Sequence, residues 1–203
     1  VNARRALSGK PIANALLTRN AGSLPRTPPR SFSARYGLDA AAVTEMPVER
    51  GIARLFGLED RFLGPMGPDR ALALEERAAR TREALTDHRF VYVHLKGPDE
   101  PGHDGDGDRK REMIEAIDGA FFGPFLKQLD PSVRVAVTAD HATPVAVHGH
   151  SDDPVPLLLW GSAVPPTSPA APKFSEEACA RGRLGTRTAR ELLPLFLAPS
   201  LPA

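Results

Sequence analysis

The sequence is poor in cysteine and has no long apolar run. Because Cys179 is its one cysteine, the 203-residue chain cannot form an internal disulfide, which favours a reducing compartment. No apolar stretch approaches the roughly 20 residues that span a bilayer, and the basic N-terminus lacks the apolar segment of a secretory signal. We therefore expect a cytoplasmic protein that does not enter a membrane.

A charge excess of either sign is also missing. The chain has 26 basic and 25 acidic residues, a formal net charge of +1 at pH 7. Nucleic-acid-binding domains generally carry a strong basic excess, so we expect no nucleic-acid partner. The length allows one sizeable hydrophobic core. Since nothing marks a second domain, we expect a single domain over residues 1–203.

Short apolar segments alternate with longer segments of helical periodicity. Strands are predicted at residues 12–18, 39–44, 61–63, 90–95, 133–139 and 155–160. Helices are predicted at residues 46–57, 69–87, 108–129 and 187–197. This alternation indicates βαβ units, and hence an α/β fold with a mostly parallel sheet and helices on both faces.

Potential metal ligands lie beside the ends of three predicted strands. They are Asp99, His103, Asp140, His141 and His150. Carboxylate and imidazole suit Zn and Mn, and open α/β sheets bind ligands at strand ends. Adjacent residues of an extended chain point to opposite sides, so the neighbours Asp140 and His141 would serve two ions, or one ion and a supporting contact. Convergence of the three loops predicts a two-metal site with ions about 3.5–4 Å apart.

The remaining histidines are not expected to be ligands. His94 lies inside a predicted strand, which favours packing there, and we interpret His88 and His148 as surface residues.

Three sequence blocks carry a resemblance to a known family. They are HLKGPDEPGHDGDGDRKREMIEAID, VTADHATP and HGHSDDPVPLLLWG. They resemble the C-terminal half of the archaeal-type cofactor-independent phosphoglycerate mutases, which belong to the alkaline phosphatase superfamily. Weaker matches follow in order along the chain: GKPIAN, RNAG, RYGLDAAAVT, VERGIARLFGLE and FSEEACARGRLG.

The resemblance implies part of an alkaline-phosphatase-like core that holds two divalent ions, Mn or Zn. By motif, Asp99, His103 and His150 resemble the ligands of one ion, and Asp140 and His141 resemble half the ligands of the other. In the RNAG element, Arg19 would clamp a substrate phosphate or carboxylate. Arg5 and Lys96 are further candidates for substrate binding.

The chain departs from the family pattern in two places. The family's nucleophilic serine and a neighbouring metal-binding aspartate belong to an N-terminal half that has no match in this sequence. A family threonine and a phosphate-binding lysine correspond by position to Arg70 and Glu75. Replacing that lysine by glutamate would invert a charge that faces an anionic substrate.

The resulting hypothesis is a metal-dependent phosphomutase domain. In the intact enzyme it would interconvert 2- and 3-phosphoglycerate through a phosphoserine, while the chain alone would be inactive. Two alternatives are a phosphate or phosphonate ester hydrolase of the same superfamily and a non-catalytic metal-binding module.

The chain would be a piece of a larger enzyme or a degenerate standalone relative. If the other half adds strands to the same sheet, its absence leaves a strand edge and an apolar face uncovered. The expected partners are therefore a phosphoglycerate-like molecule and either the missing half or a second copy.

Overall fold

The computed structural model describes residues 2–11, 22–23, 26–162, 164 and 173–199, which fall into two units, Val1–Arg30 and Ser31–Ala203. The first unit contains helix α1 (Asn2–Leu7). The strand predicted at residues 12–18 lies outside the described residues. The single domain expected over residues 1–203 stays a prediction. Within the described residues, no helix is long and apolar enough to cross a membrane.

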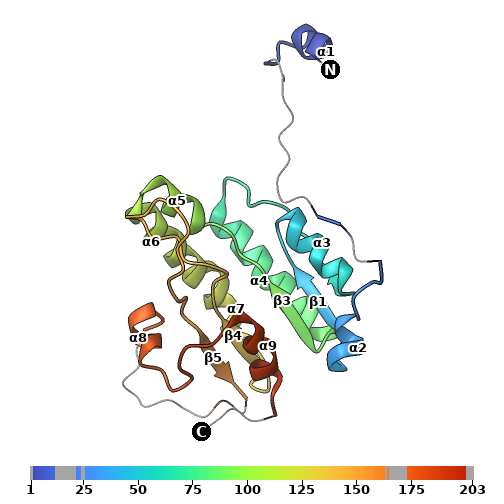
Figure 1. The fold of residues 1–203 in the computed structure, drawn as a ribbon, viewed down its shortest axis with the longest axis vertical. Coiled ribbons are helices and arrows are strands. Elements are labelled where there is room, and N and C mark those ends of the chain that lie inside the picture. Colours follow the sequence, from blue (N-terminus) through green and yellow to red (C-terminus); the bar gives the residue numbers. More distant parts are fainter. Residues whose placement is uncertain (1, 12–21, 24–25, 163, 165–172, 200–203) are drawn as a thin grey trace. The chain divides into compact units, whose positions relative to one another are not determined.

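A three-stranded parallel sheet with strand order β2-β1-β3 forms one part of the second unit (Figure 1). Its strands are β1 (Ala40–Val43), β2 (Glu59–Asp60) and β3 (Phe90–Val93). Helix α3 (Pro47–Leu55) connects β1 to β2, and helix α4 (Arg70–Asp87) connects β2 to β3. All four residues of β1 are buried, so both faces of this central strand are covered. The α/β prediction with a parallel sheet is confirmed.

The two remaining strands form a separate sheet, contrary to the expected parallel pairing. Strand β4 (Arg134–Val137) pairs antiparallel with β5 (Leu158–Gly161) and not with β3. A parallel return needs a crossover connection, usually a helix. Residues 138–157 contain no helix, so the chain re-enters beside β4 in the opposite direction.

A long helical run packs on the other side of α4 from the parallel sheet (Figure 1). The sequence predicted one helix at 108–129. The structure has α6 (Gly107–Ala116), a π-helix η1 (Ile117–Phe122) and α7 (Gly123–Lys127). Short helices that periodicity did not reveal are α2 (Phe32–Tyr36), α5 (Asp99–Asp104) and α8 (Glu176–Ala180). Helix α9 (Ala189–Leu197) lies where it was predicted and begins with a Thr188–Glu191 capping box.

One buried cluster joins the helices to both sheets. Its members are Leu74, Ala78, Met113, Phe121 and Phe125. Val93 and Leu95, at the end of β3, and Val135, in β4, pack against it. Strands β3 and β4 therefore rest on the same helical layer although they belong to different sheets.

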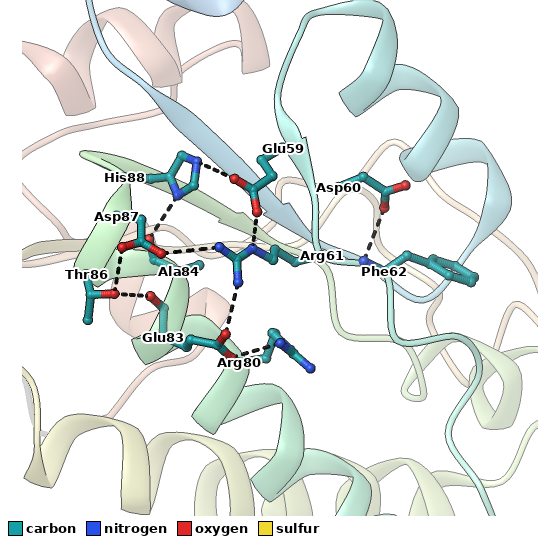
Figure 2. A network of polar contacts seen from close by, with 10 residues as sticks. All are labelled: Glu59, Asp60, Arg61, Phe62, Arg80, Glu83, Ala84, Thr86, Asp87 and His88. Atoms are coloured by element: carbon teal, nitrogen blue, oxygen red, sulfur yellow. Dashed lines mark hydrogen bonds and ion pairs between the residues drawn. The ribbon is translucent and has the colours of Figure 1, made fainter.

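An ion-pair network ties β2 to the end of α4 (Figure 2). Arg61 lies among the carboxylates of Glu59, Glu83 and Asp87. The His88 side chain is 11% exposed and contacts Glu59 through Nε2 at 3.0 Å. Its Nδ1 donates to the Ala84 carbonyl at 3.2 Å. The interpretation of His88 as a surface residue was therefore wrong.

Among the residues that the structure describes, the most deeply buried ion pair joins α4 to the end of β1. The side chains of Arg77 and Glu45 are 4% and 3% exposed, with Nη2 3.2 Å from Oε2. Arg77 also donates to the carbonyls of Ala73 and Gly64. The other carboxylate oxygen of Glu45 accepts the backbone N–H of Lys96. Each charged group thus has hydrogen-bond partners besides the other, which a buried pair requires.

Replacing Arg77 by methionine should lower the free energy of unfolding by about 3–5 kcal/mol, because the Glu45 charge would stay buried without its partner. Urea unfolding measures the change. Arg80→Met is the control, since Arg80 and its partner Glu83 are 39% and 52% exposed, and it should cost less than about 0.5 kcal/mol. Equal effects of the two variants would contradict the prediction. Adding Glu45→Met to Arg77→Met should recover part of the loss.

Candidate metal centre

Helix α5 places two of the predicted ligands on one face. Asp99 and His103 are four residues apart, so they lie above each other on the helix surface. His103 Nε2 is 3.4 Å from Asp99 Oδ1. The helix begins with acidic residues, which suit its positive N-terminal dipole, and ends at Gly105 in the left-handed region.

The loop between β4 and β5 brings in two more histidines. An isolated bridge between Ala142 and Ser151 closes the base of this loop. His150 Nε2 then lies 3.5 Å from Asp99 Oδ1 and 3.2 Å from His103 Nε2. The His141 ring stacks on the His150 ring with centroids 3.7 Å apart. The loop thus places two imidazoles directly opposite the α5 ligands.

The donor geometry fits a divalent ion. The three atoms Asp99 Oδ1, His103 Nε2 and His150 Nε2 are separated by 3.4, 3.5 and 3.2 Å. A tetrahedral zinc ion with bonds of roughly 2.0–2.1 Å holds its ligands about 3.3–3.4 Å apart. Ligand atoms of Asp99, His141 and His150 also lie within 4.8 Å of one another. The family resemblance had assigned Asp99, His103 and His150 to one ion, and the structure brings these three together.

Asp140 lies beside His141 and not on the opposite side of the chain. Its Oδ2 is 3.4 Å from His141 Nε2, and its side chain is 70% exposed. Strand β4 ends at Val137, so Asp140 and His141 lie in a bend where the alternation of an extended chain does not apply. The pair can offer a carboxylate oxygen and an imidazole nitrogen to a second ion at the edge of the first site.

Thr143 supports the site, and sequence reasoning missed it. Its buried hydroxyl donates to Asp99 Oδ1 at 2.7 Å, so its oxygen must accept from His141 Nδ1, 3.2 Å away. His141 therefore carries its proton on Nδ1 and keeps the Nε2 lone pair for a metal. The sequence offered no signal for this contact beyond the place of Thr143 in the VTADHATP block, because its partner Asp99 is 44 residues away.

Three opposing effects set the charge of Asp99. Burial pushes its pKa up, whereas the Thr143 hydrogen bond and the electrostatic interactions with His103, His141 and His150 push it down; the net result is a lowered pKa. A lowered folded-state pKa means that the ionised carboxylate stabilises the fold above its unfolded-state pKa. That contribution is lost as the pH falls through the folded-state pKa.

The predicted substrate-binding cations have different outcomes. Lys96 follows β3, three residues before Asp99, and is exposed. Arg5 lies in α1 of the first unit, where its Nε donates to the Pro11 carbonyl at 2.7 Å. Arg19 lies outside the described residues. Of the two positions that depart from the family pattern, Arg70 begins α4 and Glu75 is exposed on the same helix.

Comparison with known proteins gives a family match over nearly the whole chain. The model of the metalloenzyme superfamily matches residues 6–199. The 2,3-bisphosphoglycerate-independent phosphoglycerate mutase of Aeropyrum pernix is 48% identical over 189 residues, covering 92% of this chain and 44% of that protein. The mutase of the same name from Methanopyrus kandleri is 40% identical over 198 residues, covering 95% and 45%. The chain thus spans less than half the length of these relatives.

Solved structures agree with the fold. The PH0037 protein from Pyrococcus horikoshii superposes with a TM-score of 0.81 at 34% identity, covering 100% of this chain and 54% of that one. The cofactor-independent phosphoglycerate mutase from Thermoplasma acidophilum gives 0.57 at 23% identity, covering 97% and 46%, and supports the fold alone. The predicted resemblance is confirmed.

Thr143→Val should weaken metal binding by about 10- to 100-fold, because loss of a hydrogen bond that orients a ligand typically has this effect. Isothermal titration of the chain with Zn²⁺ measures it. Thr143→Ser keeps the hydroxyl and should bind like the unaltered chain. In metal-free protein, Thr143→Val should also lose less stability on acidification than the unaltered chain, because the pKa of Asp99 rises toward its ordinary value and less of the carboxylate's contribution is present to lose. Equal Zn²⁺ affinity of the valine and serine variants would rule out this role.

Proposed function

Because the chain belongs to the metalloenzyme superfamily, we propose that it forms most of the metal site of a phosphoglycerate mutase that interconverts 2- and 3-phosphoglycerate. The observation that carries this proposal is the triangle of Asp99 Oδ1, His103 Nε2 and His150 Nε2, with sides of 3.2–3.5 Å. Its support is the 48% identity to a mutase over 189 residues.

The residues would divide between two ions, Mn or Zn. Asp99, His103 and His150 would hold one, and Asp140 and His141 would contribute to the other. When bound, such ions lower the pKa of a nucleophile and neutralise charge on a transferring phosphoryl group. Thr143 lowers the pKa of Asp99 and holds His141 in the tautomer with a free Nε2. The chain's own contribution is therefore a preorganised set of donors.

The nucleophile would come from the other half of the enzyme. In the proposed ping-pong reaction, a serine oxygen attacks the phosphorus of 3-phosphoglycerate and forms a phosphoserine, while the bond to the glycerate 3-oxygen breaks. The glycerate then reorients, its 2-hydroxyl attacks the phosphoserine, and 2-phosphoglycerate leaves with the serine restored. Lys96, three residues before Asp99, and Arg19 are proposed to bind the anionic groups of the substrate.

Two features of the described surface fit a second polypeptide half. Strand β3 is an edge strand of the parallel sheet, and β4 pairs with β5 alone among the described strands. Each of the two strands therefore has one edge without a hydrogen-bonded neighbour strand. Both pack on the same buried cluster. Leu158 and Trp160, alternate residues of β5, are 41% and 46% exposed. We propose that the other half pairs with these edges and covers this apolar face.

A hydrolase of the same superfamily is the second candidate function. Glu75 at the position of a phosphate-binding lysine favours it, because a carboxylate there repels the phosphoglycerate that a mutase must retain through both half-reactions. Retention of the substrate matters less to a hydrolase, because a hydrolase transfers the phosphoryl group to water and not back to the same molecule. A non-catalytic metal-binding module would bind the ion without turnover.

Metal binding should stabilise the chain through Asp99. Zn²⁺ or Mn²⁺ at 100 times its dissociation constant should add about 2.7 kcal/mol to the free energy of unfolding, and a thermal shift measures it. Asp99→Asn should abolish the shift. Asp108→Asn removes the same charge from an 82% exposed side chain and should keep it. No shift with either metal would sink the proposed function.

The chain alone should not turn over 3-phosphoglycerate, since it lacks the proposed serine. Mixing it with the part of the Aeropyrum pernix mutase that it does not match should restore isomerisation. Measuring 2-phosphoglycerate and free phosphate in one assay separates mutase from hydrolase. Asp99→Asn should abolish turnover of either kind, and Asp108→Asn should not. Robust isomerisation by the unmixed chain would contradict the two-part proposal.

A further inference from the structure

His148 has an unusual backbone conformation for its residue type. Within the described residues, it is the one non-glycine residue with a positive φ, at 54°. L side chains rarely adopt this left-handed region without compensating contacts. The residue ends the turn Pro144–His148, in which its N–H bonds to the Pro144 carbonyl at 3.2 Å, two residues before the ligand His150. The sequence had indicated only a surface histidine.

His148 and His103 exchange two hydrogen bonds. His148 Nδ1 lies 3.2 Å from the His103 carbonyl oxygen, and His103 Nδ1 lies 3.2 Å from the His148 carbonyl oxygen. A carbonyl oxygen can only accept, so both Nδ1 atoms must carry the hydrogen. His103 is thereby held in the tautomer whose Nε2 has a free lone pair, and that Nε2 faces His150 and Asp99.

Helix α5 is shaped to receive the His148 ring. Gly105 ends the helix with φ +76°, and a Cβ at this position would lie 2.1 Å from His148 Cε1. An alanine there would have to displace the ring. Gly37 ends α2 in a similar conformation, with φ +68°, but an added Cβ would meet nothing within 4 Å. Gly105 is therefore needed for the close contact with His148 and not only for its backbone conformation, whereas Gly37 makes no such contact.

From these contacts we infer that His148 is a positioning residue for the metal centre. Its ring, seated on Gly105 and bound to the His103 carbonyl, anchors the loop on α5. The anchored loop presents its own carbonyl to His103 Nδ1 and carries His150 to within 3.2 Å of His103 Nε2. This inference rests on the proposed metal site and adds the residue that fixes the geometry and tautomer of one ligand.

Two different substitutions that remove the contact between the His148 ring and α5 should have the same effect on metal binding. His148→Gly removes the ring and leaves a residue that adopts the left-handed conformation easily. Gly105→Ala keeps the ring but displaces it from α5. Each should weaken Zn²⁺ binding by about 10- to 100-fold in titration calorimetry. Gly37→Ala introduces comparable backbone strain elsewhere and should leave the affinity unchanged. Because both routes remove one contact, the double variant His148→Gly/Gly105→Ala should lose no more affinity than His148→Gly.

The substitution His148→Asn tests whether the hydrogen bond to the His103 carbonyl or the size of the imidazole ring is what matters. Asn tolerates the left-handed region, and its side-chain NH₂ can donate to the His103 carbonyl in place of Nδ1. His148→Asn should therefore retain most of the Zn²⁺ affinity that His148→Gly loses. Wild-type affinity in both His148→Gly and Gly105→Ala would overturn the inference.

An NMR measurement tests the inference without metal. Two-bond ¹H–¹⁵N spectra of metal-free protein, recorded about 1.5 pH units above the ordinary histidine pKa, should show His103 protonated on Nδ1. In His148→Gly the proton should redistribute toward Nε2. An Nε2-protonated His103 in the unaltered chain would refute the inference even if Zn²⁺ binds. Conversely, failure of the unaltered chain to bind Zn²⁺ would count against the proposed function and leave the NMR result to decide the role of His148.

Discussion

The candidate site depends on the close approach of the loop 142–151 to helix α5. Gly102 permits it, because a Cβ there would lie 2.6 Å from the Thr143 carbonyl oxygen. Lys110 Nζ donates to that same oxygen at 2.6 Å and joins α6 to the contact. With the two backbones this close, Thr143 reaches Asp99, and His150 reaches the His103 ring. A larger side chain at the helix surface would separate ligands that come from two distant parts of the sequence.

The ligands could be predicted from sequence because their types and strand-end positions are local signals. Their division between ions came from the family resemblance, which assigned Asp99, His103 and His150 to one ion, and the donor atoms of these three lie together. Thr143 could not be assigned, since its partner Asp99 is 44 residues away and a threonine is chemically ordinary. The same holds for His148, whose role appears only when the loop lies on α5. Supporting hydrogen bonds arise from tertiary structure, and a linear pattern does not encode them.

The fold was predictable to a similar degree. The βαβ alternation indicated the parallel sheet correctly, but the antiparallel return of β5 was missed because an apolar strand looks the same in either direction. The helical run 107–127 was expected to be uniform. Its inward residues Met113, Ile117, Phe121 and Phe125 are four apart, and in an α-helix each such step drifts by about 40°. The wider π turn at η1 offsets this drift and keeps the four residues against one cluster.

The three atoms of the Asp99–His103–His150 triangle all belong to one chain. An ion bound there would take all three of these donors from residues 99–150. Changes elsewhere in the protein that spare this segment and the contacts that hold it would leave the triangle intact. Metal affinity and any catalytic activity can therefore be lost independently of each other.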